Sequence, residues 1–213
     1  MGAHYNVICV FLFFGLILMN FISEVTCEDK ESTLELVHVL YRHGDRAPIE
    51  LFPTDPNQEH NWPEGLGQLT KRGKKMQYKL GQWLRERYDS VISDHYIPEE
   101  VYARSTDVDR TLMSVQCNLA GFYLPNDEWK FKKDLPWVPT PIHTAPIEYD
   151  MLLNVEKTCP RVDIEIEKQN ELPEVKNLTE ESKDLFEFLT EKSGKNISDI
   201  LHVDYLYDTL YIE

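Results

Sequence analysis

Residues 42–48 read Arg-His-Gly-Asp-Arg-Ala-Pro, so two arginines flank a histidine within a very short stretch of chain. The planar guanidinium group of arginine matches the oxygens of a phosphate, and a neutral imidazole between two such groups can attack phosphorus. A lone histidine is more often a structural residue in a turn, but two arginines beside it are costly to place without an anion. This spacing predicts a phosphate site in which His43 is the nucleophile and Arg42 and Arg46 bind the phosphoryl oxygens.

A second block, residues 101–111, reads Val-Tyr-Ala-Arg-Ser-Thr-Asp-Val-Asp-Arg-Thr and supplies a further cation, Arg104. The apolar run Leu34–Tyr41 precedes the first block, and residues 99–103 precede Arg104. We expect both runs to be strands of a parallel sheet, because the carboxyl ends of such strands meet at one edge. Cations gathered around the imidazole then lower the pKa of His43 by repulsion, which keeps it nucleophilic in acid.

The residues between and after these blocks predict helices. Thr70 is expected to cap a helix whose apolar face holds Leu69, Met76, Leu80, Trp83, Leu84 and Tyr88. Thr106 or Asp107 is expected to cap a second helix, and the prolines and aromatic residues of 125–160 predict an irregular excursion. The alternation of strand and helix predicts an α/β fold: an open, mostly parallel sheet flanked by helices, followed by the start of a smaller helical or irregular cap.

The pattern Arg-His-Gly-x-Arg-x-Pro, together with the block around Arg104, resembles the signature of the histidine acid phosphatases. The likeness runs from about Leu34 to the end of the chain and favours the prostatic, lysosomal and insect venom members. It implies a histidine phosphatase-like fold and hydrolysis of phosphomonoesters through a phosphohistidine on His43, with phosphate contacts from Arg42, Arg46 and Arg104. Small phosphomonoesters or phosphoproteins are the implied substrates, and neither a metal nor another cofactor is implied.

The chain departs from this family in lacking its late His-Asp pair, which supplies a phosphate contact and the general acid. We therefore expect a C-terminally truncated sequence. Residues 28–124 are expected to form the N-terminal part of the phosphatase core, and residues 125–213 the beginning of an incomplete, acidic cap with a helix over 179–193. Cys159 resembles a family cysteine whose disulfide partner lies further along the chain than this sequence extends.

Two alternatives to an active acid phosphatase remain open. The missing general acid is compatible with a catalytically impaired, secreted short form that binds phosphate or a partner. A phytase-like phosphatase shares the same motif, although a highly anionic substrate would favour a more basic pocket than this region predicts.

Features outside the site predict an exported glycoprotein. Residues 1–27 contain the uncharged apolar run Val7–Ile22 and are expected to be a signal peptide, and the sequons at Asn177 and Asn196 predict N-glycosylation. We therefore expect a secreted, extracellular protein, with the lysosome as the alternative and no membrane anchor in this chain. The net charge of −15, without any basic stripe, argues against nucleic acid as a partner. A homodimer is left open.

Overall fold

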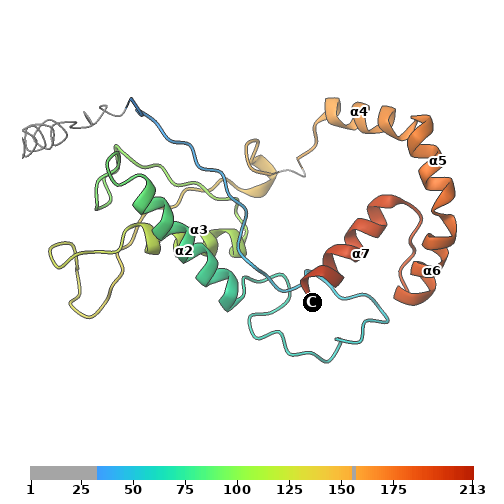
Figure 1. Ribbon diagram of the computed structural model, residues 1–213, viewed down its shortest axis with the longest axis horizontal. Coiled ribbons are helices and arrows are strands. Elements are labelled where there is room, and N and C mark those ends of the chain that lie inside the picture. The colour runs from blue at the N-terminus through green and yellow to red at the C-terminus, as the bar shows by residue number, and fades with distance from the viewer. Residues whose placement is uncertain (1–32, 155–156) are drawn as a thin grey trace, which may run out of the picture. The chain divides into compact units, whose positions relative to one another are not determined.

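The structure of the chain is a computed structural model that describes residues 33–154 and 157–213 (Figure 1). Its internal contacts divide the chain into two units, Met1–His38 and Val39–Glu213. The signal peptide predicted for residues 1–27 lies outside the described residues. Both predicted phosphate-binding blocks lie within Val39–Glu213.

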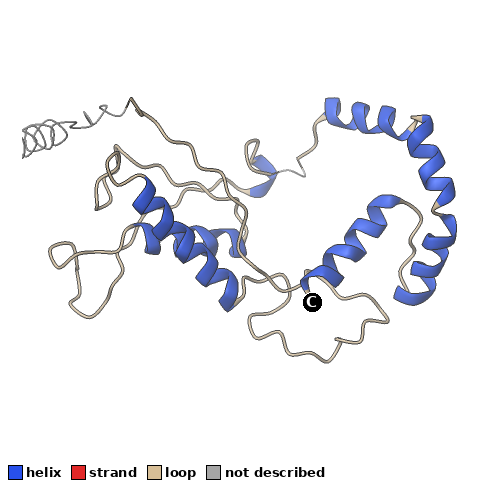
Figure 2. Ribbon diagram, in the orientation of Figure 1, coloured by secondary structure: helices blue, strands red, loops and turns tan. Residues whose placement is uncertain are grey.

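Helices joined by long loops make up the regular structure of the described residues (Figure 2). In chain order they are α2 (Lys71–Arg87), α3 (Asp109–Phe122), the 3₁₀ helix η1 (Ile147–Tyr149), α4 (Pro160–Asn170), α5 (Pro173–Glu181), α6 (Lys183–Ser193) and α7 (Ile200–Ile212). The helix predicted over residues 179–193 corresponds to α6 and the end of α5, whereas α4 and α7 were not predicted. None of the helices in the described ranges combines the length and apolar character that a membrane span requires.

The predicted sheet is not confirmed, because neither Leu34–Tyr41 nor residues 99–103 form a strand in the described chain. In place of a sheet there are isolated bridges, antiparallel between Arg46 and Leu69 and parallel between Arg104 and His143. A strand requires a neighbouring strand to pair its backbone N–H and C=O groups. Within the described ranges, Leu34–Tyr41 pairs with no neighbouring strand, and its apolar residue Leu40 is 87 % exposed.

Helices α2 and α3 cross in close contact, because each carries a glycine where the backbone of the other approaches. A Cβ atom on Gly81 would lie 1.9 Å from the carbonyl oxygen of Asn118. One on Gly121 would lie 2.1 Å from the carbonyl oxygen of Tyr78. Any larger residue at either position therefore forces the two helices apart.

This close crossing explains why the predicted apolar face of α2 is only partly buried. The buried residues of the helix are Gly73, Gln77, Gly81 and Leu84. Met76 and Trp83, which the periodicity assigned to the apolar face, remain 50 % and 52 % exposed. The contact with α3 covers a narrow stripe of small and polar residues and leaves the flanks of the helix uncovered.

The helix starts were predicted with mixed success. Thr70 caps α2 as expected, because its hydroxyl oxygen accepts a hydrogen bond from the backbone N–H of Gly73 at 3.0 Å. The cap predicted for α3 is wrong, since the helix starts after Val108, which makes no side-chain cap. The hydroxyl of Thr106 lies instead 2.7 Å from the hydroxyl of Thr111.

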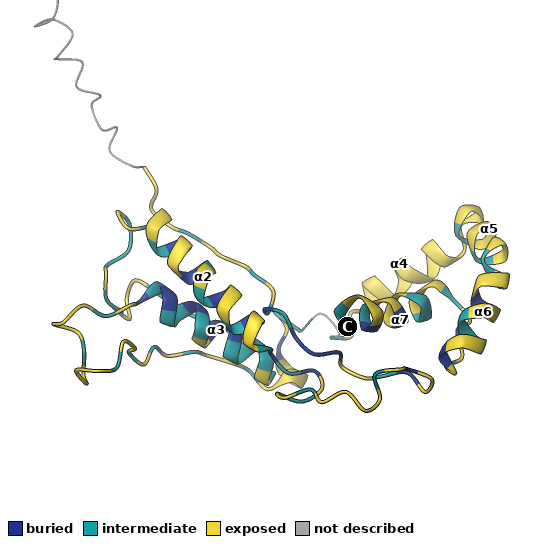
Figure 3. Cartoon of the chain, turned by 60° about the horizontal axis from the view of Figure 1, so that its bottom comes forward, coloured by how far each residue is buried: buried dark blue, intermediate teal, exposed yellow. Residues whose placement is uncertain are grey.

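A second small core joins the loop before α2 to the C-terminal helices. Phe52 packs in one cluster with three residues from the C-terminal part of the chain. They are Phe186 of α6, Ile197 of the loop after α6, and Leu206 of α7. The hydroxyl of Thr209 in α7 also donates to a backbone carbonyl of this loop. Figure 3 shows that the surfaces of α4 and α5 are mostly exposed by comparison. The core therefore fixes α7 beside the loop that follows the first phosphate-binding block.

Candidate active site

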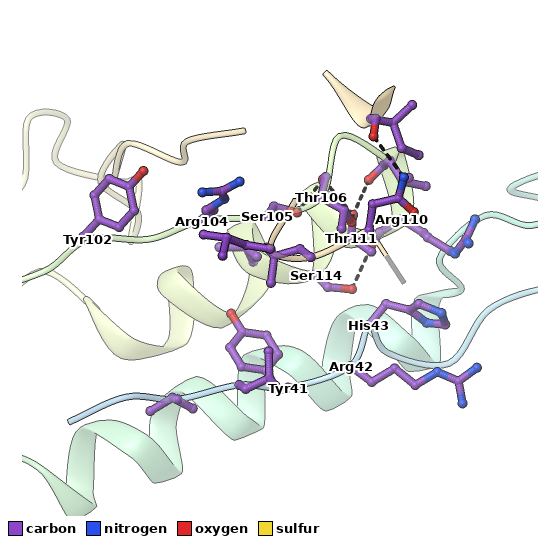
Figure 4. A pocket seen from close by; sticks show the side chains of 18 residues that line it. Tyr41, Arg42, His43, Tyr102, Arg104, Ser105, Thr106, Arg110, Thr111 and Ser114 are labelled. Atoms are coloured by element: carbon purple, nitrogen blue, oxygen red, sulfur yellow. Dashed lines mark hydrogen bonds between the residues drawn. The ribbon is translucent and has the colours of Figure 1, made fainter. Parts of the chain in front are cut away.

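The two predicted blocks line one cavity of about 780 Å³, which Figure 4 shows from close by. Its polar lining consists of Tyr41, Arg42, His43, Tyr102, Arg104, Ser105, Thr106, Arg110, Thr111, Ser114 and Asn154. Apolar residues such as Leu40, Ile147 and Leu152 complete it. The structure thus brings Arg42, His43 and Arg104 to one cavity, as the sequence predicted, while Arg46 is not among the lining residues.

The backbone of the loop that carries the histidine is fixed by hydrogen bonds to side chains of α2 and α3. The N–H of Gly44 donates to the hydroxyl oxygen of Ser114 at 3.2 Å, and the Gln77 amide donates to the carbonyl oxygen of Arg42 at 2.9 Å. Gly44 is required here, because a Cβ atom would lie 2.5 Å from the carbonyl oxygen of Gly73. The motif glycine therefore lets the loop pack directly against α2.

His43 is held in the tautomer that a nucleophile needs. Its Nδ1 atom lies 2.8 Å from the carbonyl oxygen of Gly44. A carbonyl only accepts hydrogen bonds, so Nδ1 carries the proton and Nε2 keeps its lone pair.

The pKa of His43 is lowered from its ordinary value of 6.5, as the sequence predicted. Burial is the largest cause, and the positive charges of Arg110, Arg42 and Arg46 add to it, in that order. The hydrogen bond to Gly44 opposes them. The sequence prediction named only the cations and so missed the leading cause, burial.

Arg104 is anchored through both its backbone and its side chain. Its Nη2 donates to Oδ1 of Asp150 at 2.8 Å. On the backbone, the N–H of Ser105 donates to the carbonyl of His143, and the N–H of His143 donates to the carbonyl of Ala103, each at 3.0 Å. Two residues within the irregular excursion, His143 and Asp150, thus position this cavity-lining arginine.

Arg46 is engaged elsewhere. Its Nη2 donates to Oδ2 of Asp208 in α7 at 2.7 Å, and its Nη1 donates to the carbonyl oxygen of Ala47 at 3.1 Å. The side chain is only 5 % exposed. Arg46 still lies near enough for its charge to lower the pKa of His43.

Sequence reasoning missed three residues of this arrangement: Arg110, Asp150 and Asp208. Arg110 stands in the second block and is the cation with the largest effect on the pKa of His43. The signal available from the sequence was its place in the same block as Arg104. The structure puts it at the start of α3, where it lines the same cavity. Asp150 and Asp208 lie far along the chain from the arginines that they bind, so only the tertiary structure identifies them.

The residues predicted for modification lie away from the cavity. Asn177 in α5 and Asn196 after α6 are both exposed, as attachment of a glycan requires. Cys117 is half-buried in α3, Cys159 is exposed just before α4, and both are free thiols. Burial raises the pKa of the Cys117 thiol, which suits an unreactive packed residue.

Comparison with known families places the whole cavity within one matched region. Residues 33–192 match the family described as the histidine phosphatase superfamily, branch 2. Lysosomal acid phosphatase of Bos taurus is 41 % identical over 182 residues, which cover 85 % of this chain and 43 % of the relative. Prostatic acid phosphatase of Bos taurus is 38 % identical over 201 residues, which cover 93 % and 52 %. The chain therefore spans about half the length of these curated relatives.

Among solved structures, the phytase of Klebsiella sp ASR1 superposes with a TM-score of 0.53. The match covers 80 % of this chain and 49 % of the phytase, at 18 % sequence identity. Such a likeness concerns the fold alone. It supports the predicted α/β class, although no sheet is formed by the described residues.

Proposed function

The chain belongs to branch 2 of the histidine phosphatase superfamily, and from this premise we propose that it hydrolyses phosphomonoesters through a phosphohistidine on His43. The observation that carries the proposal is a histidine with a free Nε2 in a cavity that Arg42, Arg104 and Arg110 also line. Cations beside a neutral nucleophile suit an anionic phosphorus centre.

In the first step, Nε2 of His43 attacks phosphorus. A bond forms between nitrogen and phosphorus while the bond between phosphorus and the ester oxygen breaks, and the departing oxygen takes up a proton from solvent. In the second step, a water oxygen bonds to phosphorus while the bond between phosphorus and Nε2 breaks. The water releases a proton to solvent, inorganic phosphate leaves, and the neutral imidazole is restored. The hydrogen bond from Nδ1 to Gly44 keeps the ring oriented through both steps.

The arginines are proposed to stabilise the phosphoryl oxygens in two different ways. Arg42 and Arg104 line the cavity and bind these oxygens directly. Arg46, predicted from the sequence to do the same, donates to Asp208 and Ala47. We therefore assign it an electrostatic role, in which its charge favours the anion and helps to keep His43 neutral.

The names of the matched relatives favour an acid phosphatase over the phytase-like and non-catalytic alternatives. The lowered pKa of His43 agrees with activity in acid, because a larger share of the imidazole is unprotonated at a given acidic pH than for a histidine with the ordinary pKa. These names also support the proposal that the protein is secreted or lysosomal. The exposed sequons support the proposal that it is glycosylated at Asn177 and Asn196. We also propose that residues 28–124 belong to the core and residues 125–213 to a cap. A homodimer is likewise a proposal.

The test is hydrolysis of an aryl phosphate by the whole chain, because an aryl leaving group needs little help from a general acid. His43→Ala is expected to reduce turnover by at least about 1,000-fold, as removal of a nucleophile does. His202→Ala, which removes a half-exposed histidine paired with Asp199 in α7, is the matched control. Unchanged turnover in His43→Ala would refute the proposal.

A further inference from the structure

Asp150 is a completely buried carboxylate beside the cavity, with 0 % of its surface exposed. It directly follows η1, and its Oδ1 atom accepts hydrogen bonds from the backbone N–H groups of Leu152 and Leu153, each at 3.1 Å, and from Arg104 at 2.8 Å. We propose that Asp150 is a positioning residue, which holds the Arg104 guanidinium for the phosphoryl group. This inference rests on the proposed phosphatase function.

The carboxylate is kept ionised by its surroundings. The pKa of Asp150 is held below its ordinary value, chiefly by the N–H of Leu153, with further contributions from Leu152 and from the charge of Arg104. The two backbone N–H groups hold the carboxylate in place independently of the Arg104 side chain. Asp150 therefore gives the guanidinium a fixed reference point in the main chain.

The same environment argues against Asp150 as a general acid. A general acid must hold a proton at the working pH, whereas the donors around Asp150 hold the pKa of its carboxyl group below the ordinary value even though burial opposes them. Its Oδ1 atom is also occupied by three donors. The residue is suited to orienting a cation and not to delivering a proton.

The arginine has donors left for a phosphate. A guanidinium group carries five N–H donors, and the bond to Asp150 uses one of them. The side chain of Arg104 is 26 % exposed although its Nε atom is buried, so the donors that a ligand can reach are those of the terminal nitrogens. A planar group fixed at Nη2 therefore offers its remaining donors to an oxyanion with little loss of rotamer entropy.

A purely structural role for Asp150 explains only part of the contacts. Capping the turn at Leu152 and Leu153 accounts for two of the hydrogen bonds, but not for the ion pair with an arginine 46 residues earlier. Asparagine at position 150 retains an Oδ1 atom that can accept from both backbone N–H groups, and it replaces the ion pair with Arg104 by a neutral contact. Asp150→Asn thus keeps the turn and weakens the hold on the guanidinium group.

The experiment measures the dissociation constant of inorganic phosphate by calorimetry with the whole chain. Asp150→Asn is expected to weaken binding about tenfold, because a misplaced binding group commonly costs one to two orders of magnitude. In an Arg104→Ala background the same change should have no further effect. Asp127→Asn, which removes an exposed carboxylate paired with Lys130, is the control and should leave binding unchanged.

Arg104→Lys is a second variant in case Asp150→Asn unfolds. It keeps a cation but loses the planar fork that Asp150 orients, so it should weaken phosphate binding about as much as Asp150→Asn does. Wild-type affinity in Arg104→Lys, or losses in Asp150→Asn that persist in the Arg104→Ala background, would overturn the inference alone. Failure of the wild-type chain to bind phosphate would overturn the proposed function as well.

Discussion

Two arginine–aspartate pairs lie near the same histidine, and they differ in what they leave available to a ligand. In the pair of Arg104 and Asp150, the carboxylate is buried and the arginine lines the cavity. In the pair of Arg46 and Asp208, the arginine is 5 % exposed and the carboxylate is 41 % exposed. In each pair the buried member is fixed and the other member is accessible. The first pair therefore presents the cation of Arg104 to a ligand, and the second presents the carboxylate of Asp208 to solvent.

Under the proposed phosphatase function, the difference means that a motif arginine does not become a phosphate ligand by its sequence position alone. Arg46 and His43 belong to one short block, yet α7 supplies the carboxylate that engages Arg46. Arg104 comes from a distant block and reaches the cavity because Asp150 binds only one edge of its guanidinium. The partner of each arginine decides whether the cation contacts a ligand or acts through its charge.

The largest expected effect separates the two arginines directly. Arg104→Ala should weaken binding of inorganic phosphate about 10- to 100-fold, because a charge-assisted hydrogen bond contributes about 1.5–3 kcal/mol. Arg46→Ala should weaken it by only about threefold, because a screened charge interaction is lost without a direct contact. Calorimetric titration of the whole chain measures both dissociation constants.

Arg72→Ala is the matched control for this pair, because it removes an exposed arginine of α2 that does not line the cavity. Thermal unfolding of each variant confirms that the chain is folded before titration. A loss in Arg46→Ala as large as that in Arg104→Ala would break the comparison, since it would give both arginines direct contact with the anion.

A smaller effect concerns the charge that Arg110 contributes at His43. Arg110→Gln removes a repulsion that lowers the pKa of His43, so this pKa should rise toward 6.5. The nucleophile is neutral above its pKa, and the acidic limb of the profile of kcat/KM against pH should therefore move to higher pH. Arg110→Lys keeps the charge and should leave the limb in place.

An acidic limb that stays unchanged in Arg110→Gln would contradict the order of the cations around His43. The same measurement on Arg46→Gln sharpens the comparison of the two pairs. The charge of Arg46 is the weakest of the three arginine contributions, so its removal should move the limb in the same direction but less.

The sequence predicted which residues gather at the cavity better than it predicted the structure that supports them. Arg42, His43 and Arg104 were identified from their types and spacing, and Thr70 from its place before an amphipathic helix. These features depend on local sequence, where capping and side-chain chemistry act over a few residues. The predicted direction of the pKa shift of His43 is likewise confirmed.

The features that sequence reasoning missed depend on contacts between distant residues. Leu34–Tyr41 has the composition of a buried strand, but a strand also needs a neighbour to pair with, which composition does not supply. The glycines at positions 81 and 121 were not singled out from the sequence, although they allow the close contact between α2 and α3. Asp150 and Asp208 carried no local signal, because each acts only on an arginine far away in the sequence.

The most direct test of the central claim is to trap the phosphorylated chain. The whole chain is mixed with an aryl phosphate, quenched in alkali, which preserves phosphohistidine, and the modified residue is located by mass spectrometry. The account predicts phosphate on His43, lost on brief acid treatment and absent in His43→Ala. Phosphate on Ser105 or Ser114, which line the same cavity, or turnover without any phosphorylated intermediate, would contradict it.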